Sequence, residues 1–538
     1  MRLGVWHLLL AASALVILGS APIPHMDADT PLYARIALDV VKTGDWVTLH
    51  HPQGVVVDKP PVVFWLMAAS FRVLGFSDVT LRLWQLLLAL GVIALTYATA
   101  RLVGCSREEG LLAALMLATA VQFYYQATVP QQDVALTLFL TLAVYGMLQY
   151  VERRRVSGAM VAAAAVALAV LTKGIAGLAL FGAVALATLA LIRRSLPFSG
   201  ARVAAHIALA SAVFAVLALP WFVAGMLRQG EPFVHTFFTS GTLGVGRFFR
   251  PALSTPPPYL ASVFAYVPML FLGMLPWSPV LVVAAGTLPR LFRQEAIGMR
   301  IVAAWGLAIF AALSLSSGDK VLRYLLPCLP PAAILASRAM TSLVPGSRRL
   351  ATVAWIALVP AVAVLAVVFW FAWSGFPLER QLLVPVALPV LVAIGLALIA
   401  FGVAGLLGRP RSAAALAACC VLVGYALFER AMVTHAEAID PWPGIARATA
   451  RRVAESSRVV LYGRLGSASG FAYLYFDKPL STMDGLADLA RVWRQERVLV
   501  IVPAERLHEL ARLDPALVIV HQSPARLLVV ANWSAAAR

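Results

Sequence analysis

The sequence MDADTPLYARIALDVVKTGDWVTLHHPQGVVVDKPPVVFW, residues 26–65, is a polar loop between two long apolar segments. Its acids, histidines and Lys-Pro-Pro corner contrast with a chain of which 61% is hydrophobic and only 13% is charged. Soluble domains average about 25% charged and about 45–50% apolar residues. The composition therefore predicts a polytopic α-helical membrane protein, and the loop is where we expect its chemistry.

The first half of the loop predicts an amphipathic helix. Asp29 and Thr30 can cap a helix whose first residue is Pro31, because proline needs no N–H at that position. Apolar residues recur at helical spacing, and Gly44 stands where a left-handed residue would end the helix. We expect the helix to lie flat at the membrane surface. A purely structural alternative makes Asp29 only a cap.

The second half of the loop ends in Asp58-Lys59-Pro60-Pro61, which opens the next apolar run. This places a carboxylate and an ammonium at the edge of the bilayer. The structural alternative for Lys59 is an anchor whose ammonium reaches the lipid headgroups.

The remaining apolar segments predict a bundle of about 13 transmembrane helices. The first could instead be a signal peptide, because Gly19-Ser20-Ala21 offers small residues for cleavage, but its length suits a span. The predicted spans are 3–22, 80–100, 108–124, 133–151, 158–172, 174–192, 203–226, 260–289, 299–316, 322–342, 350–373, 382–407 and 412–429.

Arginines in the short loops predict the orientation. All the clusters fall on the side of the N-terminus, which the positive-inside rule makes cytoplasmic. An odd number of spans then places loops 23–79 and 228–260 and the C-terminus outside the cytoplasm. The clusters are Arg101 with Arg107, Arg153–Arg155, Arg193-Arg194 with Arg202, Arg290 with Arg293 and Arg300, Arg348-Arg349, and Arg409 with Arg411.

The net charge of +18 is explained by these topological anchors. No run of interleaved aromatics and arginines suggests a nucleic-acid groove, so we expect no nucleic-acid partner. The four cysteines contain no CxxC pair and predict neither a disulfide framework nor a zinc site.

Beyond about residue 431 the spans stop, so we divide the chain into a membrane domain, 1–430, and an α/β domain outside the membrane, 431–538. Strand-like runs alternate there with amphipathic helices, and no nucleotide-binding glycine-rich loop is evident. We expect this domain to be a lid or docking surface. The predicted strands are 459–462, 471–475, 498–502, 517–520 and 527–530, and the helices are 443–454, 484–494 and 504–513.

Three motifs follow one another along the first loop: Asp29-Thr-Pro-Leu-Tyr33-Ala, Thr43-Gly-Asp-Trp46-Val-Thr, and Asp58-Lys-Pro-Pro61 with Phe64-Trp65. Together they resemble the first periplasmic loop of the bacterial lipid A aminoarabinose transferases. These are polyprenyl-phosphate-sugar-dependent membrane glycosyltransferases of the GT-C superfamily, related to protein O-mannosyltransferases. The resemblance implies the GT-C fold, inverting transfer from an undecaprenyl phosphate donor to lipid A, and a part in polymyxin resistance. It also implies that the chain lies in a bacterial inner membrane, with the active site and the C-terminal α/β domain facing the periplasm.

Two charged residues at the outer ends of spans match positions of the same family. Asp133 follows Val129-Pro-Gln-Gln at the start of the fourth span, and Lys173 lies in a Thr-Lys-Gly turn. Ionisable groups at such depths are costly unless they are paired or face water. The resemblance implies catalytic roles for Asp29 and Asp133, with Lys173 supporting the donor phosphate. The alternative for Lys173 is an interface anchor.

Arg247 and Tyr324 are further donor-phosphate candidates. Arg247 stands in Gly244-Val-Gly-Arg, where backbone amides and a guanidinium can converge on a phosphate, ahead of a family-like Leu275-Pro-Trp277 span. Tyr324 belongs to a pattern resembling the family's Lys-x-x-x-Tyr-x-x-Pro signature, although its prolines could simply kink a helix.

The chain departs from the family at two places. Ser240-Gly241-Thr242 stands where relatives have a Glu-His pair, and Asp58 stands where they commonly have Glu. If a divalent cation binds, Asp58 and His235 are the candidate ligands; no nucleotide cofactor is expected.

The expected reaction displaces a phosphate from the anomeric carbon, and cations must neutralise the departing polyprenyl phosphate. Lys59, Arg247 and Tyr324 are assigned that role, while Asp29 orients or deprotonates the acceptor and Tyr33 and Asp58 position substrate. We expect a monomer acting on lipid A. The alternatives are a protein or glycan O-glycosyltransferase and a lipid-linked-sugar transporter, although transporter folds place their polar sites near the midplane.

Overall fold

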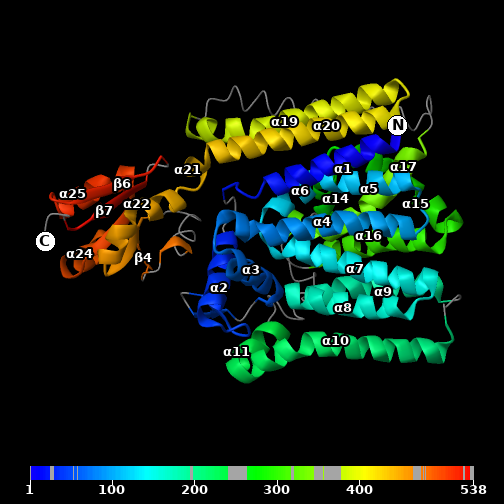
Figure 1. Ribbon diagram of the computed structural model, residues 1–538, viewed down its shortest axis with the longest axis horizontal. Coiled ribbons are helices and arrows are strands. Elements are labelled where there is room, and N and C mark those ends of the chain that lie inside the picture. The colour runs from blue at the N-terminus through cyan, green and yellow to red at the C-terminus, as the bar shows by residue number, and fades with distance from the viewer. Residues whose placement is uncertain are drawn as a thin grey trace.

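The computed structural model describes residues 2–24, 29–51, 54–56, 59–193, 198–239, 263–316, 320–343, 356, 377–463, 474–476, 478, 480–524 and 527–533. Long apolar helices lie side by side in a bundle, and a small α/β unit lies beyond one end of it (Figure 1). Eight described helices are long and apolar enough to cross a membrane, or nine if one bent pair counts as a span. The chain is therefore a polytopic α-helical membrane protein. The count of about 13 spans stays a prediction, because most of segment 350–373 lies outside the described residues.

The described helices follow the predicted apolar segments. Figure 1 shows α19 and α20 along one edge of the bundle and α10 along the opposite edge. The bundle helices are α1 (Arg2–Gly19), α4 (Asp78–Leu102), α5 (Arg107–Thr119), α6 (Val121–Thr128), α7 (Gln132–Arg153), α8 (Val156–Lys173), α9 (Ile175–Ile192), α10 (Gly200–Gln229), α14 (Tyr266–Gly273), α15 (Ser278–Gln294), α16 (Ile297–Leu315), α17 (Leu329–Thr341), α19 (Pro377–Leu406) and α20 (Pro410–Thr434).

Three predicted continuous spans are interrupted, which corrects the sequence-based picture. The span at 108–124 is two helices bent by 61°, and the backbone N–H of Val121, at the start of the second, donates to the Leu275 carbonyl. The span at 260–289 contains α14 and α15, separated at Met274–Trp277. The span at 322–342 begins as the 3-10 helix η3 (Leu322–Cys328), which contains Pro327, before α17. Proline removes a helical hydrogen bond, so an apolar run alone does not predict a continuous helix.

The polar loop folds over one end of the bundle as α2 (Asp29–Thr43), β1 (Leu49–His51), β2 (Gly54–Val56) and α3 (Val62–Leu74). Helix α2 begins at Asp29, two residues before the expected Pro31, and ends before Gly44, whose φ is +72°. Tyr33, Ile36 and Val40 are buried on the face that packs against α3. In Figure 1, α2 and α3 lie at the end of the bundle that faces the α/β unit. Further along, α11 (Glu231–Val234) and the π-helix η1 (His235–Thr239) follow α10.

The C-terminal unit is built on a five-stranded sheet of order β4-β3-β5-β7-β6. Strand β3 is parallel to β4 and β5, whereas β7 is antiparallel to both β5 and β6. Its elements are α21 (Ala436–Ile439), α22 (Trp442–Glu455), β3 (Arg458–Tyr462), β4 (Leu480–Met483), α24 (Leu486–Gln495), β5 (Val498–Pro503), η5 (Ala504–Arg506), α25 (Leu507–Leu513), β6 (Val518–Gln522) and β7 (Leu527–Ala531).

One predicted strand in this unit is not a strand in the structure, and one observed strand was not predicted. Leu474 and Tyr475, predicted in a strand, are helical and pack against the membrane bundle, with the Tyr475 ring 6.4 Å from that of Phe76. Strand β4 was missed because Leu-Ser-Thr-Met is a short, half-polar edge strand. The division of the chain at residues 430 and 431 stays a prediction.

Candidate active site

Asp133 and Lys173 form a short ion pair at the end of the bundle next to α2. Asp133 lies in the first turn of α7, and Lys173 is the last residue of α8. The two helices pack along their length, and Lys173 Nζ lies 2.5 Å from Asp133 Oδ1. The Asp133 residue is only 3% exposed, and a buried carboxylate is costly without a partner. An acid at a helix N-terminus and a base at a C-terminus also match the two helix dipoles.

Asp29 joins this pair through two residues that the sequence analysis had not assigned, Arg323 and Gln131. Arg323 Nη1 lies 3.6 Å from Asp29 Oδ2, and Arg323 Nε lies 3.9 Å from Asp133 Oδ2. Gln131 donates to Asp29 Oδ2 at 3.4 Å and accepts from Arg323 Nη1 at 3.3 Å. Two features of the sequence could have pointed to them: Arg323 directly precedes Tyr324, and Gln131 lies two residues before Asp133. Four elements thus bring two carboxylates and two cations together.

Tyr324 lies against the same cluster, and Pro60, the residue after Lys59, lies near the Lys173 turn. Lys173 Nζ is 4.4 Å from the centre of the Tyr324 ring, a cation–π distance. Gly174, next to Lys173, has φ +62°, and a Cβ built on it would lie 3.9 Å from Pro60 Cγ, so the Lys59-Pro60 corner abuts the Lys173 turn. The structure therefore brings together predicted residues from three distant parts of the sequence.

The Tyr33 ring packs beside the Lys59 ammonium. Lys59 Nζ lies 5.4 Å from the centre of the Tyr33 ring, and that ring meets Phe64 edge-on at 5.2 Å between centroids. Tyr33 is buried, so its ring is a fixed surface for the ammonium. Its predicted part in substrate positioning stays a prediction.

Buried polar side chains from α4 fix the chain just before Asp133. Arg82, only 1% exposed, donates through Nε to the Thr128 carbonyl at 3.2 Å. Gln85 Nε2 donates to the carbonyls of Gln126 and Val129, both at 3.0 Å. These bonds satisfy carbonyls left unpaired at the end of α6. They hold the segment that carries Gln131 and Asp133 in one conformation.

Asp45 organises the outer loop. Its Oδ1 accepts hydrogen bonds from the backbone N–H groups of Val47 and Thr48 at 2.9 and 3.1 Å, and Arg228 Nη1 lies 2.7 Å away. Partial burial alone would raise the pKa of Asp45, but these bonds and the Arg228 charge together hold that pKa below its ordinary value. The Trp65 indole N–H donates to the Trp46 carbonyl at 2.7 Å, which ties the loop to α3.

The remaining site predictions are not tested by these contacts. Asp58 and Arg247 lie outside the described residues. His235 is exposed on η1. Among the residues that the structure describes, no group of three or more His, Cys, Asp and Glu side chains is placed to hold a metal. The proposed cation therefore stays a prediction.

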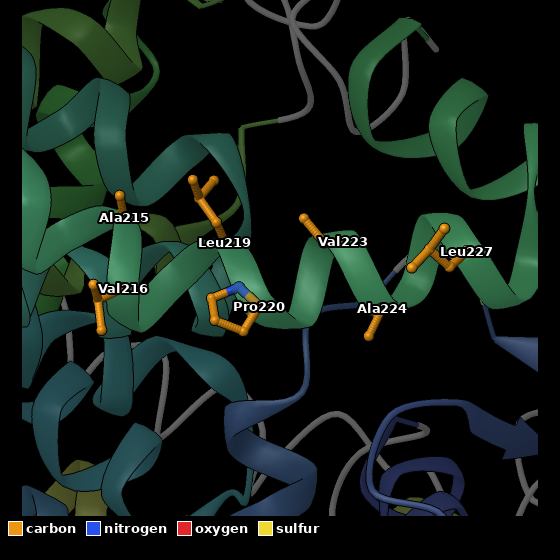
Figure 2. A pocket seen from close by; sticks show the side chains of 7 residues that line it. All are labelled: Ala215, Val216, Leu219, Pro220, Val223, Ala224 and Leu227. Atoms are coloured by element: carbon orange, nitrogen blue, oxygen red, sulfur yellow. The ribbon is translucent and has the colours of Figure 1, made fainter.

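A different kind of surface lies on α10. Figure 2 shows apolar side chains along one stretch of this helix around Pro220, bordering a shallow hollow of about 500 Å³. Most of this helix is exposed, as expected for a span facing lipid. The hollow is chemically unlike the charged cluster at Asp133. Its lining residues are Ala215, Val216, Leu219, Pro220, Val223, Ala224 and Leu227.

Comparisons with known proteins agree with this architecture. The family model described as dolichyl-phosphate-mannose-protein mannosyltransferase matches residues 58–222. An undecaprenyl phosphate-alpha-4-amino-4-deoxy-L-arabinose arabinosyl transferase from Aeromonas salmonicida is 27% identical over 65% of this chain and 62% of its own length. An uncharacterised protein from Aquifex aeolicus is 32% identical over 28% of the chain and 30% of its own length. The matches to these relatives thus span less than two thirds of the relatives' lengths.

Solved structures match over nearly the whole chain. The crystal structure of ArnT from Cupriavidus metallidurans bound to undecaprenyl phosphate has a TM-score of 0.75 at 24% identity, covering 98% of both chains. The same protein in the apo state has a TM-score of 0.74 at 23% identity, covering 99% of both chains. The membrane fold predicted from the sequence is confirmed.

Proposed function

We propose that this chain, which belongs with the lipid A aminoarabinose transferases in the GT-C superfamily, is a membrane glycosyltransferase using an undecaprenyl phosphate-linked sugar. The sugar we propose is an amino sugar such as aminoarabinose, and the acceptor is lipid A phosphate. The observation that carries the proposal is the cluster of Asp29, Asp133, Lys173 and Arg323, assembled from four elements at one end of the bundle.

The side of the membrane supports a lipid-linked donor. The arginine-rich loops are predicted to lie on the same side of the membrane as the N-terminus, which is the cytoplasmic side. The charged cluster is therefore assigned to the opposite, periplasmic face. Nucleotide sugars are absent there, and a donor must enter laterally from the bilayer. Its lipid chain would leave the sugar phosphate at the surface, where α2 and α3 cover the bundle.

The residues divide into two chemical groups. Lys59, Tyr324 and Arg247 bind the donor phosphate, with Lys173 as support, because the departing phosphate gains negative charge. Asp29 and Asp133 face the acceptor. A hydroxyl acceptor needs a base, whereas a phosphate acceptor is already anionic, so with lipid A Asp29 would position the acceptor or bind a cation. Direct displacement would invert the anomeric carbon.

A protein or glycan O-glycosyltransferase is the second candidate. The observation that favours it is the match of residues 58–222 to a family described by its protein mannosyltransferase activity. The two functions share the donor chemistry and differ in the acceptor.

Mass spectrometry of a deletion strain tests the proposal. We expect lipid A to lose an amino-sugar mass when the gene is removed, and to regain it with the wild-type gene but not with Asp133→Asn. A change confined to periplasmic proteins would favour O-glycosylation. No change in lipid A, protein or glycan would contradict transferase function.

A further inference from the structure

Arg323 occupies the centre of the charged cluster without a tight contact to either carboxylate. Its guanidinium lies 3.6 Å from Asp29 and 3.9 Å from Asp133, and its side chain is 32% exposed. Charged N–H to oxygen bonds are ordinarily about 2.7–2.9 Å long. Arg323 is therefore shared between two acids and bonded closely to neither.

Lys173 differs in this respect. Its ammonium is 2.5 Å from Asp133 and is also covered by the Tyr324 ring. Moving Lys173 to a substrate would leave the nearly buried Asp133 carboxylate without its closest counterion, which is costly. Moving Arg323 would give up two ion contacts that are already long and its hydrogen bonds to the neutral side chains of Gln131 and Tyr324. Of the two cations, Arg323 has the weaker contact with Asp133 and can change partner at the lower cost.

The segment that carries Arg323 is anchored just before it. Lys320 Nζ donates to the carbonyls of Leu313, Ser314 and Ser316 at 2.8, 3.0 and 2.6 Å. An ammonium at the C-terminus of α16 also offsets the helix dipole. The chain three residues before Arg323 is thus tied to the end of α16, and the long arginine side chain can rotate from a fixed backbone.

The formal charges of the four residues balance. Asp29 and Asp133 carry two negative charges, and Lys173 and Arg323 carry two positive charges. In the proposed reaction the bond between the anomeric carbon and the phosphate oxygen breaks, and its electron pair stays on that oxygen. The acceptor oxygen bonds to the same carbon. The donor phosphodiester, with one charge, thereby becomes a phosphomonoester that can carry two.

We propose that Arg323 moves from Asp29 and Asp133 to the leaving polyprenyl phosphate, where it neutralises the added charge. This inference rests on the proposed function. It makes Arg323 a product-phosphate ligand that prefers the dianionic monophosphate to the singly charged donor. The groups facing Arg323 are Asp29 on α2, Asp133 and its neighbour Gln131 at α7, Lys173 on α8 and the adjacent Tyr324.

Binding of undecaprenyl monophosphate to the purified full-length protein tests this role between pH 5 and 8. The second pKa of a phosphate monoester is about 6, so the ligand gains its second charge within this range. Wild-type affinity should rise with pH. Arg323→Gln should bind about 10- to 100-fold more weakly at pH 8, the range for a lost charged hydrogen bond, and should lose most of the rise with pH.

Two further variants separate charge from folding. Arg323→Lys keeps the positive charge and should keep the rise in affinity with pH. Arg411→Gln removes an exposed, ion-paired arginine that contacts Glu108, and should match wild type. The inference is overturned if Arg323→Gln keeps the wild-type pH dependence, or if folded Arg323→Lys loses it. If the wild type binds no undecaprenyl monophosphate at any pH, the proposed function itself fails.

Discussion

Asp29 lies in the first turn of α2. A carboxylate there has two possible roles: it can merely stabilise the N-terminus of the helix, or it can take part in the reaction. Asparagine serves nearly as well as aspartate at a helix N-terminus, but it cannot accept a proton or carry charge. We expect Asp29→Asn to lower turnover by about 10²–10⁴ if it acts as a base, with donor binding retained. A partial loss that varies with added divalent metal would instead assign Asp29 to cation or acceptor positioning.

Asp39→Asn is the matched control for Asp29→Asn. It is the same substitution on the same helix, at a residue paired with Arg35 one turn away. Turnover of Asp39→Asn should stay near wild type when each variant is assayed with and without chelator. Normal turnover of Asp29→Asn under both conditions would remove Asp29 from the active site.

The sequence drew attention to single charged residues but not to their partners. Asp133 and Lys173 were found because isolated charges at the ends of apolar spans are costly, and the structure pairs them. Arg323 was missed because its reach to Asp29 depends on the 3-10 turn of η3, which no periodic pattern indicates. Gln131 was missed because a neutral amide carries no such signal.

Helices α7 and α8, which carry Asp133 and Lys173, approach closely at two glycines. A Cβ on Gly146 would lie 2.6 Å from the Gly158 carbonyl oxygen, and a Cβ on Gly158 would lie 2.5 Å from that of Gly146. Small residues permit such close helix packing in membranes. We expect Gly146→Ala to destabilise the protein by about 1–3 kcal/mol, seen as a lower Tm in detergent.

Gly182→Ala is the control for this substitution. Gly182 is also in a transmembrane helix, α9, and a Cβ there meets nothing within 4 Å. Its Tm should stay within error of wild type. Equal Tm values for both variants would show that the close approach of α7 and α8 does not limit stability.

The C-terminal unit offers a pH-dependent ion pair. Glu509 accepts hydrogen bonds from Arg506 Nε at 2.7 Å and from the Tyr462 hydroxyl at 2.6 Å. The bond from Arg506, then that from Tyr462, lowers the pKa of Glu509 from 4.5 to about 2. Because the folded pKa is depressed, this stabilisation is complete above about pH 4.5 and is lost as the pH falls toward 2.

Glu509→Gln should therefore lower the Tm at pH 7, and the difference from wild type should shrink below about pH 4.5. Glu505→Gln, on the preceding turn, should show no such pH-dependent difference. A Glu509→Gln deficit that is unchanged at pH 3 would mean that packing, and not charge, causes it.

The boundaries of helices and strands could be predicted where a segment has a clear apolar pattern. Strands β3, β5 and β7 coincide with predicted apolar runs, because buried strands need continuous apolar residues. The edge strand β6, which is half-exposed, overlaps the predicted run 517–520 but ends two residues later. The bend between α5 and α6 could not be predicted, since the segment is apolar throughout and the Val121 N–H finds its partner on Leu275. A contact between distant segments, and not the local sequence pattern, accompanies this bend.

The orientation of the whole chain in the membrane can be measured with fusion reporters. Reporters inserted within residues 30–60 and after residue 435 should give periplasmic signals, and reporters at Arg153–Arg155 should give cytoplasmic signals. The structure places α2 and the C-terminal unit toward the same end of the bundle (Figure 1). A cytoplasmic signal after residue 435 would contradict the orientation and move the charged cluster to the wrong side for a lipid-linked donor.

The global fold was predictable because apolar length and arginine distribution are whole-chain properties that tolerate local error. The 0.75 TM-score to ArnT over 98% of the chain agrees with that prediction. The choice of acceptor was not predictable, because it depends on contacts between the outer loops and a substrate headgroup.

We propose that the cluster around Asp133 serves the transfer of a sugar from a polyprenyl phosphate. The most direct test incubates the purified protein in proteoliposomes with undecaprenyl phosphate-aminoarabinose and lipid A, and follows both lipids by mass spectrometry. We predict stoichiometric appearance of undecaprenyl monophosphate and aminoarabinose-modified lipid A with wild type, and neither product with Asp133→Asn. Unchanged donor with folded wild-type protein, beside an active aminoarabinose transferase as positive control, would contradict the account.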